Sequence, residues 1–297
     1  MTTDWDVLAD GIAVAPRTGP FPHGPFLRAV EEASGTRNED LIVVDSGTIA
    51  CILVEDAGTI RFAGPETLTD YHSPLGADVE GLAGAFRDMS GARLRLDSMP
   101  HEACDVVVQA LDAVGAEFSV SEHEATAVLD LPDTVDAWLA SIGKKERHEV
   151  RRKRRRFVEE FGEVAIVEAG PEAMGAFCAM HRASEGPKGS FMTATMEAFF
   201  LSLVTTAGAS IHNLVCDGRT RASAFGFETP DGYYYYNSAY DPDAAMASPG
   251  VVLLASLIER QISRGAAVFD FLKGDEAYKY RHGARRRPLF VVEGVVP

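Results

Sequence analysis

Apolar and polar residues in the C-terminal third alternate in three runs that predict β-strands. These runs, IHNLVC, RASAFGF and YYYYNSAY, are separated by Asp-Gly at 217–218 and by Pro-Asp-Gly at 230–232. Because these residues favour tight turns between β-prone segments, we expect an antiparallel meander. The segment SPGVVLLASLIERQISRG then places apolar residues at helical spacing, and the strand AVFDFL, a short polar helix around DEAYKYRHG and the strand PLFVVE follow. The predicted order is β-β-β-α-β-α-β.

The first half of the chain shows the same order of patterns. LIVV, TIACILV and TIRFAG predict three short strands, followed by a helix over about 78–89, the strand RLRLDSM, a helix over 101–114 and the strand AEFSV. A Ser-Pro-x-Gly at 73–76 precedes the first of these helices, as Ser248-Pro249-Gly250 precedes the later one. The two interpretations are a duplicated unit and a chance similarity of short elements, and the shared order favours duplication. The predicted fold class is α/β (α+β), with mixed, mostly antiparallel sheets flanked by helices.

A strongly basic segment lies between the two halves. Nine of the 28 lysine and arginine residues fall within 144–156, although the formal net charge of the chain is -16. An apolar helical stripe begins at Val135, but Lys153 and Arg154 interrupt its continuation, so this helix cannot be fully buried. We therefore predict a degenerate N-terminal domain over 1–130, a basic connector helix over 131–165 and a C-terminal domain over 166–297.

Composition places the chain among ordinary globular proteins. Its 297 residues are 46% hydrophobic and 24% charged, which excludes disordered and fibrous classes. No apolar run approaches the roughly 20 residues that span a bilayer, and MTTDWDVLADG lacks the features of an export signal, so we expect a cytoplasmic location. The four cysteines fit neither a zinc nor a disulfide spacing. The histidines have no metal spacing, with His181, His212 and His282 isolated, so no metal is predicted.

The start of the helix predicted over 249–264 is a candidate anion site. Ser248 can cap this helix, Pro249 fits its first position, and Gly250 permits close approach to free backbone N–H groups. A pyrophosphate could bind there, and the strand ending at Tyr240 would diverge from AVFDFL and offer an edge to an extended ligand arm. The candidate cofactor-binding residues are therefore Ser248, Gly250, Val251 and Tyr240. The alternative is a capped core helix that binds nothing.

The segment FDFLKGDEAYKYRHG carries a dense group of candidate catalytic residues. Acyl transfer to an amine needs a proton acceptor and a positive group that balances the developing oxyanion. Asp275 or Glu276 fits the first role and Lys279 the second, and only one of the two carboxylates is expected to face inward. The candidate substrate-binding residues of this segment are Asp270, Lys273, Tyr278 and Arg281. For any one of these residues the alternative is a solvated surface charge.

A family resemblance rests on several spaced motifs. KGSF, AFF, YYYNSAYDP, SPGVVLLASLIERQISRG and FDFLKGDEAYKYRHGA together resemble the GNAT-superfamily acyltransferases of the cellulose-biosynthesis type, which are relatives of the Fem peptidyltransferases. The resemblance covers 130–297, including a Lys/Arg-rich connector, and covers the first half only in outline. It implies tandem GNAT-like units, of which the second carries the donor site.

The resemblance also implies roles for single residues. Lys279 matches a lysine that sits at the active centre of the Fem-like relatives. The loop over 184–191 borders the acceptor cleft in the family, which would bring Lys188 and Phe191 to the substrate, and Asn237 joins them as a substrate-binding residue. The alternative for this loop is a plain turn with an exposed lysine.

Three interpretations fit the basic segment. It could bind the phosphates of an aminoacyl-tRNA, line the cleft for a smaller anion such as a nucleotide-linked sugar or coenzyme A, or form a solvated helix face paired with the acidic body. Outside 144–156 the chain has 19 basic and 42 acidic residues, which would repel an extended polyanion. The charge balance therefore favours the smaller anion over tRNA.

These observations predict an N-acyltransferase that moves an acyl group, expected to be acetyl, from acyl-CoA to an amine. By family analogy the acceptor is an amino sugar or another precursor of cell-surface glycan, which would place the enzyme in polysaccharide biosynthesis. One alternative is an aminoacyl-tRNA-dependent, Fem-like peptidyltransferase. The other is a non-catalytic, degenerate GNAT pair that holds an anionic ligand without chemistry. No membrane insertion is expected.

Overall fold

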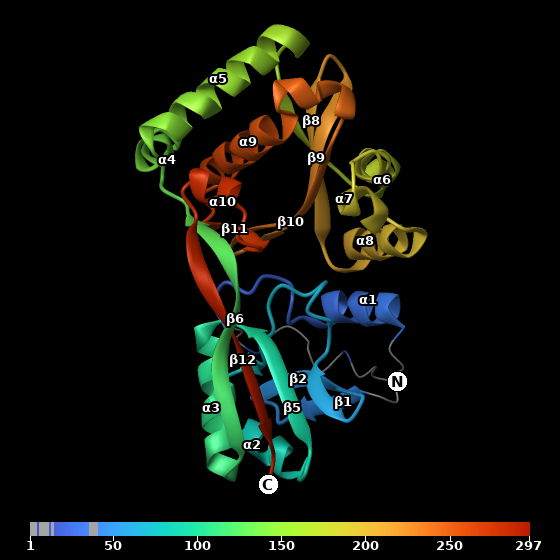
Figure 1. The fold of residues 1–297 in the computed structure, drawn as a ribbon, viewed down its shortest axis with the longest axis vertical. Coiled ribbons are helices and arrows are strands. Elements are labelled where there is room, and N and C mark those ends of the chain that lie inside the picture. Colours follow the sequence, from blue (N-terminus) through green and yellow to red (C-terminus); the bar gives the residue numbers. More distant parts are fainter. Residues whose placement is uncertain (1–4, 6–11, 13–14, 36–40) are drawn as a thin grey trace. The chain divides into compact units, whose positions relative to one another are not determined.

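The computed structural model describes residues 5, 12, 15–35 and 41–297 (Figure 1). The chain forms two compact units: unit 1 comprises Met1–Thr126 and Arg287–Pro297, and unit 2 comprises Ala127–Arg286. Apart from Trp5, the segment MTTDWDVLADG, in which no export signal is expected, lies outside the described residues. None of the helices in the described ranges combines the length and the apolar character of a membrane span.

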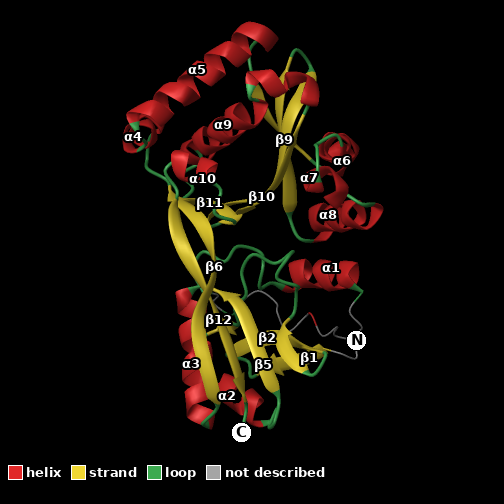
Figure 2. Ribbon diagram, viewed as in Figure 1, coloured by secondary structure: helices red, strands yellow, loops and turns green. Residues whose placement is uncertain are grey.

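Unit 1 is a twisted sheet with helices packed on it (Figure 2). Its elements are α1 (Gly24–Ser34), β1 (Leu41–Asp45), β2 (Ile49–Asp56), β3 (Thr59–Phe62), β4 (Leu75–Gly76), α2 (Val79–Arg87), β5 (Arg93–Met99), α3 (His101–Val114) and β6 (Glu117–Asp130). The strand order is β1-β2-β3-β5-β12-β6, and β4 pairs with β2. Buried side chains of α2 and α3, among them Phe86, Val107 and Leu111, form one core with strands β2, β3 and β5.

Unit 2 contains the second half of the pattern and the basic segment. Its elements are α4 (Val135–Ser141), α5 (Lys144–Phe161), β7 (Ala165–Ala169), η3 (Pro171–Ala173), α6 (Met174–Arg182), α7 (Pro187–Phe191), α8 (Ala194–Thr206), β8 (Ala209–Cys216), β9 (Arg219–Thr229), β10 (Gly232–Tyr240), η4 (Pro242–Ala247), α9 (Pro249–Ser263), β11 (Val268–Lys273), α10 (Ala277–Arg281) and the start of β12 (Arg285–Val295). The strand order is β6-β11-β10-β9-β8-β7.

Helices cover both faces of the unit 2 sheet. On one face α9, the longest apolar helix of the unit, packs with Trp138, Phe157 and Phe269 in a single core. On the other face Phe200 of α8 packs on Phe225 of β9, with ring centroids 4.7 Å apart. Figure 1 shows α9 and the α6–α8 group on opposite sides of β9 and β10. The tight Asp-Gly and Pro-Asp-Gly turns place β8, β9 and β10 in the predicted antiparallel meander.

The two halves share strand pairing as well as element order. In each half three antiparallel strands lead to a helix, and the strand after that helix pairs in parallel with the third: β3 with β5 and β10 with β11. The predicted fold class, a mixed and mostly antiparallel sheet flanked by helices, is confirmed. The last strand of each half lies beside a strand of the other half. Strand β12, which ends the second half, pairs with β5, and β6, which ends the first half, is a neighbour of β11.

This exchange explains why the compact units differ from the predicted boundaries of 1–130, 131–165 and 166–297. Residues 287–297 belong to unit 1 because β12 bonds there, and the basic segment belongs to unit 2. Helix α5 buries Val150 and Phe157 and leaves Arg151 and Arg155 exposed, in keeping with the expectation that it cannot be fully buried.

Candidate functional site

The candidate site is built around the point where β10 and β11 separate. Their parallel pairing is limited to three residue pairs, Gly232 to Tyr234 with Val268 to Asp270. Strand β10 continues to Tyr240 alongside β9, with a register shift between Tyr235 and Asn237. In this described stretch the edge of β10 that faces away from β9 is therefore not paired with β11 beyond Tyr234. Such an open edge can accept an extended ligand arm through backbone hydrogen bonds.

The end of β11 bends away for a local reason. Leu272 has a φ of 62°, a left-handed conformation that is unusual for a branched residue, and Gly274 follows with a φ of 107°. The Leu272 N–H donates to the carboxylate of Asp270 at 2.8 Å instead of to a neighbouring strand. Asp270, predicted to contact substrate, is fully buried and supports this bend.

The start of α9 lies next to the open edge, and its geometry differs in part from the expectation. Ser248 stands at the N-cap and Pro249 begins the helix, as predicted, but Ser248 has a φ of 63° and its side chain makes no capping hydrogen bond within the described residues. The N–H groups of Val251 and Val252 donate to the Ser248 carbonyl at 3.1 and 3.3 Å. An added Cβ on Gly250 would meet only Cδ1 of Tyr240, at 4.0 Å. Open space therefore faces Gly250 beside the Tyr240 ring.

The predicted acceptor loop reaches the same place. Helix α7 puts the Lys188 ammonium 5.9 Å from the centroid of the Tyr240 ring. Lys188 is exposed as a whole, and desolvation of its ammonium by the surrounding groups lowers its pKa. Phe191, at the end of α7, is 36% exposed, and its ring centroid lies 5.8 Å from that of His181. Four residues that different motifs predicted thus lie close to one another in the fold: Lys188, Phe191, Tyr240 and Gly250.

His181 connects this loop to Asn237. The ring of His181, on α6, is 1% exposed, and its Nε2 lies 3.1 Å from the side-chain oxygen of Asn237. The backbone N–H of Ser238 also donates to that oxygen, at 2.7 Å, which identifies it as the carbonyl oxygen of the amide. Nε2 must then carry the hydrogen of a neutral imidazole, and Nδ1 is left as a buried acceptor without a hydrogen-bond partner among the described residues. Sequence reasoning missed this contact because the partners are 56 positions apart.

The segment after β11 is organised around Lys279. This side chain is 3% exposed, and its ammonium donates to the carbonyl oxygens of Leu272 and Gly274, each at 3.1 Å, and to that of Lys273 at 2.5 Å. Glu276 lies 3.0 Å from the same nitrogen. The ammonium thus holds the turn that follows the left-handed Leu272, and its predicted catalytic role stays a prediction.

The remaining predicted residues of this segment lie on or near the surface of α10. Asp275 accepts a hydrogen bond from the Tyr280 hydroxyl at 2.5 Å, and Glu276 is exposed apart from its contact with Lys279. Tyr278 is 38% exposed and packs on Phe271, which in turn packs on Tyr235 of β10. Burial raises the pKa of Tyr278 above its ordinary value. Lys273 is half-buried and Arg281 is exposed.

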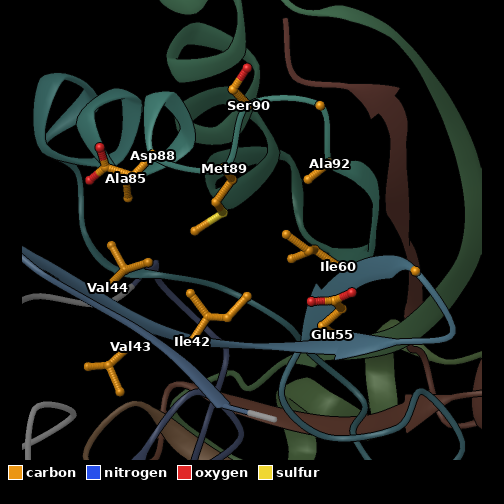
Figure 3. Close-up of a pocket in the computed structure, with 12 residues that line it drawn as sticks. Ile42, Val43, Val44, Glu55, Ile60, Ala85, Asp88, Met89, Ser90 and Ala92 are labelled. Carbon is orange, nitrogen blue, oxygen red and sulfur yellow. The ribbon is translucent and has the colours of Figure 1, made fainter.

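Each unit also contains a cavity. One, of ≈ 560 Å³ in unit 1, has a mixed lining of apolar side chains, among them Ile42, Val44 and Met89, and of the carboxylates of Glu55 and Asp88 (Figure 3). Its lining contains no lysine or arginine, so it suits an anionic donor poorly. The other, of ≈ 680 Å³, follows the start of α5 and is lined by Lys144, Lys145, Arg147, His148, Glu149 and Arg151.

Two groups of side chains in the described residues have metal-ligand character. Glu168, His212 and Glu228 lie close together in unit 2. Arg260 and Arg264 contact these two glutamates at 2.7 Å, so cations already neutralise them. The second group, in unit 1, is Glu66, Asp97 and His123.

Known proteins resemble this chain in its C-terminal part by sequence and over its length by fold. Residues 144–280 match the family model described as "Acetyltransferase (GNAT) domain". No curated protein matches the chain.

Three solved structures illustrate the likeness of fold. A conserved protein of unknown function from Bacteroides thetaiotaomicron VPI-5482 has a TM-score of 0.66 and 12% identity, covering 99% of this chain and 98% of its own. FemX has a TM-score of 0.64 and 12% identity, with coverages of 97% and 94%. L-PGS from Bacillus licheniformis has a TM-score of 0.56 and 13% identity, with coverages of 92% and 92%.

At these identities the structures establish the fold alone. The sequence match to a GNAT acetyltransferase domain is confined to residues 144–280, and the solved structures add a shared fold. They do not distinguish the cellulose-biosynthesis type from other members.

Proposed function

We propose that unit 2 transfers an acyl group from an acyl thioester, coenzyme A being the donor, to an amine. The observation that carries this proposal is the open edge of β10 where it parts from β11, with Asn237 at the register shift and Gly250 at the start of the next helix. A pantetheine arm presents amide groups that can pair with such an edge. The family match over 144–280 supports the same chemistry.

In this proposal the donor phosphates lie at the start of α9. The space facing Gly250 admits a ligand atom, and the ammonium of Lys188, beside Tyr240, adds a positive charge. Ser248, Val251 and Tyr240 complete the donor site. An anion there gains from the dipole of a 15-residue helix.

The acceptor amine enters beside α7 in this proposal, near Phe191 and Asn237, and attacks the donor carbonyl. A proton leaves the amine, and negative charge develops on the carbonyl oxygen as the tetrahedral intermediate forms. Lys279, with Asp275 or Glu276, was assigned these tasks from the sequence, and that assignment remains part of the proposal. The acceptor class, an amino sugar or another precursor of cell-surface glycan, rests on family analogy.

A second candidate is an aminoacyl-tRNA donor, and a specific observation favours it. The cavity along the start of α5 is lined by four lysine and arginine side chains. Of these, Lys144, Lys145 and Arg151 form no ion pair among the described residues, whereas Arg152 pairs with Glu149. A groove whose cationic side chains form no ion pairs can bind phosphates that lie outside the reaction centre. FemX shares the fold.

Calorimetry at two salt concentrations tests both donors. We expect acetyl-CoA to bind the parent and to bind more weakly to Gly250→Asp. Binding of an aminoacyl-tRNA that weakens steeply between 50 and 200 mM salt (about tenfold or more) and is lost in Lys144→Gln/Lys145→Gln/Arg151→Gln would favour the second donor. If neither donor binds, the transferase proposal fails. If a donor binds without turnover of any amine, the non-catalytic binding module replaces it.

A further inference from the structure

His181 is a buried base for which the fold supplies only half of the required hydrogen bonds. Its Nε2–H is bonded to Asn237, and Nδ1 is a buried acceptor for which the described part of the chain offers no hydrogen-bond partner. A buried acceptor without a partner destabilises a protein by about 1–3 kcal/mol, so native structures contain few of them. A ligand that binds beside His181 can supply the missing partner, and the ligand group must then be an N–H or O–H donor.

The position of His181 narrows the identity of that donor. Asn237 lies just beyond the register shift in β10, where the open edge begins. Phe191, whose ring contacts His181, belongs to the loop proposed to border the acceptor. Both of these neighbours of the ring lie where the proposed function places the acceptor, which is an amine and can donate an N–H group.

We propose that Nδ1 of His181 accepts the proton that the acceptor amine loses during acyl transfer. This inference rests on the proposed function and assigns its proton-accepting task to His181 in place of Asp275 or Glu276. The amine nitrogen forms a bond to the donor carbonyl carbon, and its proton moves to Nδ1, directly or through one water. The C–S bond of the thioester then breaks, and the departing thiolate takes the proton from the imidazolium. The products are an amide and a thiol, and the neutral imidazole is restored.

Contacts around the ring suit this role. Asn237 keeps Nε2 protonated, so that Nδ1 is the atom with the lone pair. Burial and the nearby charge of Lys188 lower the pKa of His181, which keeps the ring neutral at pH 7. The other charged groups on the elements packed there are Arg182 of α6 and Glu197 of α8, which pair with each other at 2.5 Å. Cys178, which lies three positions before His181 on α6, is also titratable, and burial raises its pKa.

One experiment needs no knowledge of the donor. Histidine-selective ¹⁵N NMR of the full chain reports the tautomer and charge of each imidazole. We expect His181 at pH 7 as the neutral Nε2–H form, with a titration midpoint below the ordinary value of 6.5. A neutral Nδ1–H form, or an imidazolium at pH 7, overturns the proposal even if no donor has been found.

Kinetics provide the second test. His181→Gln keeps an N–H group in reach of Asn237, because the glutamine amide can replace Nε2, but it removes the base. We expect kcat to fall about 10²–10⁴-fold. The acidic limb of the pH profile of kcat/KM should disappear, while the melting temperature stays close to that of the parent. The matched control is His212→Gln, because His212 is equally buried, on β8, and lies outside the proposed site; its pH profile should match the parent.

The outcomes separate the two proposals. A parent that consumes no donor removes the proposed function, and the NMR result still decides the state of Nδ1. A parent that turns over while His181→Gln keeps both its kcat and its acidic limb overturns the role of His181 alone. A uniform loss of rate at every pH, accompanied by a lower melting temperature, would mean that His181 only supports the fold.

Discussion

Replacing Lys279 by methionine separates a structural role of this residue from a catalytic one. The substitution keeps the apolar stem and deletes an ammonium that donates to the carbonyl oxygens of residues 272, 273 and 274. Hydrogen bonds from a charged donor contribute about 1.5–3 kcal/mol each, and an unsatisfied buried carbonyl costs about 1–3 kcal/mol. The freed carbonyls lie at the end of β11, and part of this loss is recovered by hydration after the turn relaxes. We therefore expect Lys279→Met to lower the free energy of unfolding by about 2–4 kcal/mol.

Urea unfolding, followed by far-UV circular dichroism, measures this change, and a thermal scan should show a melting temperature lower by about 5–10 °C. Two control variants isolate the cause. Lys145→Met removes the same charge from an exposed position and should change stability by less than about 0.5 kcal/mol. Glu276→Gln removes the carboxylate, which is 58% exposed, and should have a small effect, because solvent screens the pair.

A parent-like unfolding curve for Lys279→Met would refute the structural reasoning. If kcat then fell by about 10²–10³-fold, the ammonium would act on the developing oxyanion, as its place in the sequence motif predicts. A loss of both stability and kcat would be resolved by measuring rates per folded molecule at a temperature well below the lowered melting point.

Three further predictions follow from other contacts. Gly250→Asp should weaken acetyl-CoA binding by at least tenfold in calorimetry, because the carboxylate fills the space beside Tyr240 and repels the phosphates; equal affinity would remove α9 from the donor site. Arg154→Gln should lower stability by about 0.5–1 kcal/mol in urea unfolding, since Arg154 donates twice to Glu259 of α9, at 2.6 and 2.7 Å; the exposed Arg155→Gln is the control, and equal effects would contradict this account. Burial lowers the pKa of His282 to about 4, so the unfolded chain binds its proton at higher pH than the folded chain. The stability from His282 is therefore fully present above pH 6.5 and declines as the pH falls towards 4, by about 2–3 kcal/mol at pH 4.5. His282→Phe should flatten this decline in urea unfolding at pH 7 and 4.5, and an unchanged slope would exclude His282 as its source.

Local features of the sequence predicted the order of strands and helices. The turns at 217–218 and 230–232 and the apolar face of α9 depend on residues close together in the chain, so periodicity and turn chemistry suffice to find them. The exchange of β6 and β12 depends instead on which distant edge each strand meets. No local pattern encodes that choice, because either partner offers the same backbone groups.

For the candidate site too, local motifs could be found in the sequence, whereas contacts between distant residues could not. Motifs found Lys188, Tyr240 and Gly250, and the structure brings them together. The bond between His181 and Asn237 was beyond sequence reasoning, because a histidine in an apolar helix has the same appearance whether its partner is water or a distant amide. The sequence motif predicts that the Lys279 ammonium is available to substrate. In the structure this ammonium is buried and donates to three backbone carbonyl oxygens, an arrangement that depends on the folded turn.

The first half of the chain offers a control for the donor site within the same molecule. Its strands β3 and β5 also pair in parallel over a short stretch, and Ser98 of β5 has a left-handed φ of 57°, as Leu272 has at the end of β11. Each half therefore contains a short parallel strand pair in which one strand has a left-handed residue near its end. What differs is the start of the helix that precedes the fourth strand.

Helix α2 begins at a carboxylate, because Asp78 stands at its N-cap and accepts the Gly81 N–H at 3.1 Å. That hydrogen bond and one from Thr48 lower the pKa of Asp78, so its negative charge occupies the position where a ligand anion would gain from the helix dipole. An added Cβ on Gly81 would meet an Asp78 oxygen at 2.7 Å, whereas the space facing Gly250 of α9 is open. Ser248 carries no charge and makes no capping bond. Helix α2 thus supplies its own anion and α9 does not, which is a physical reason for placing the proposed donor site in unit 2 rather than in unit 1.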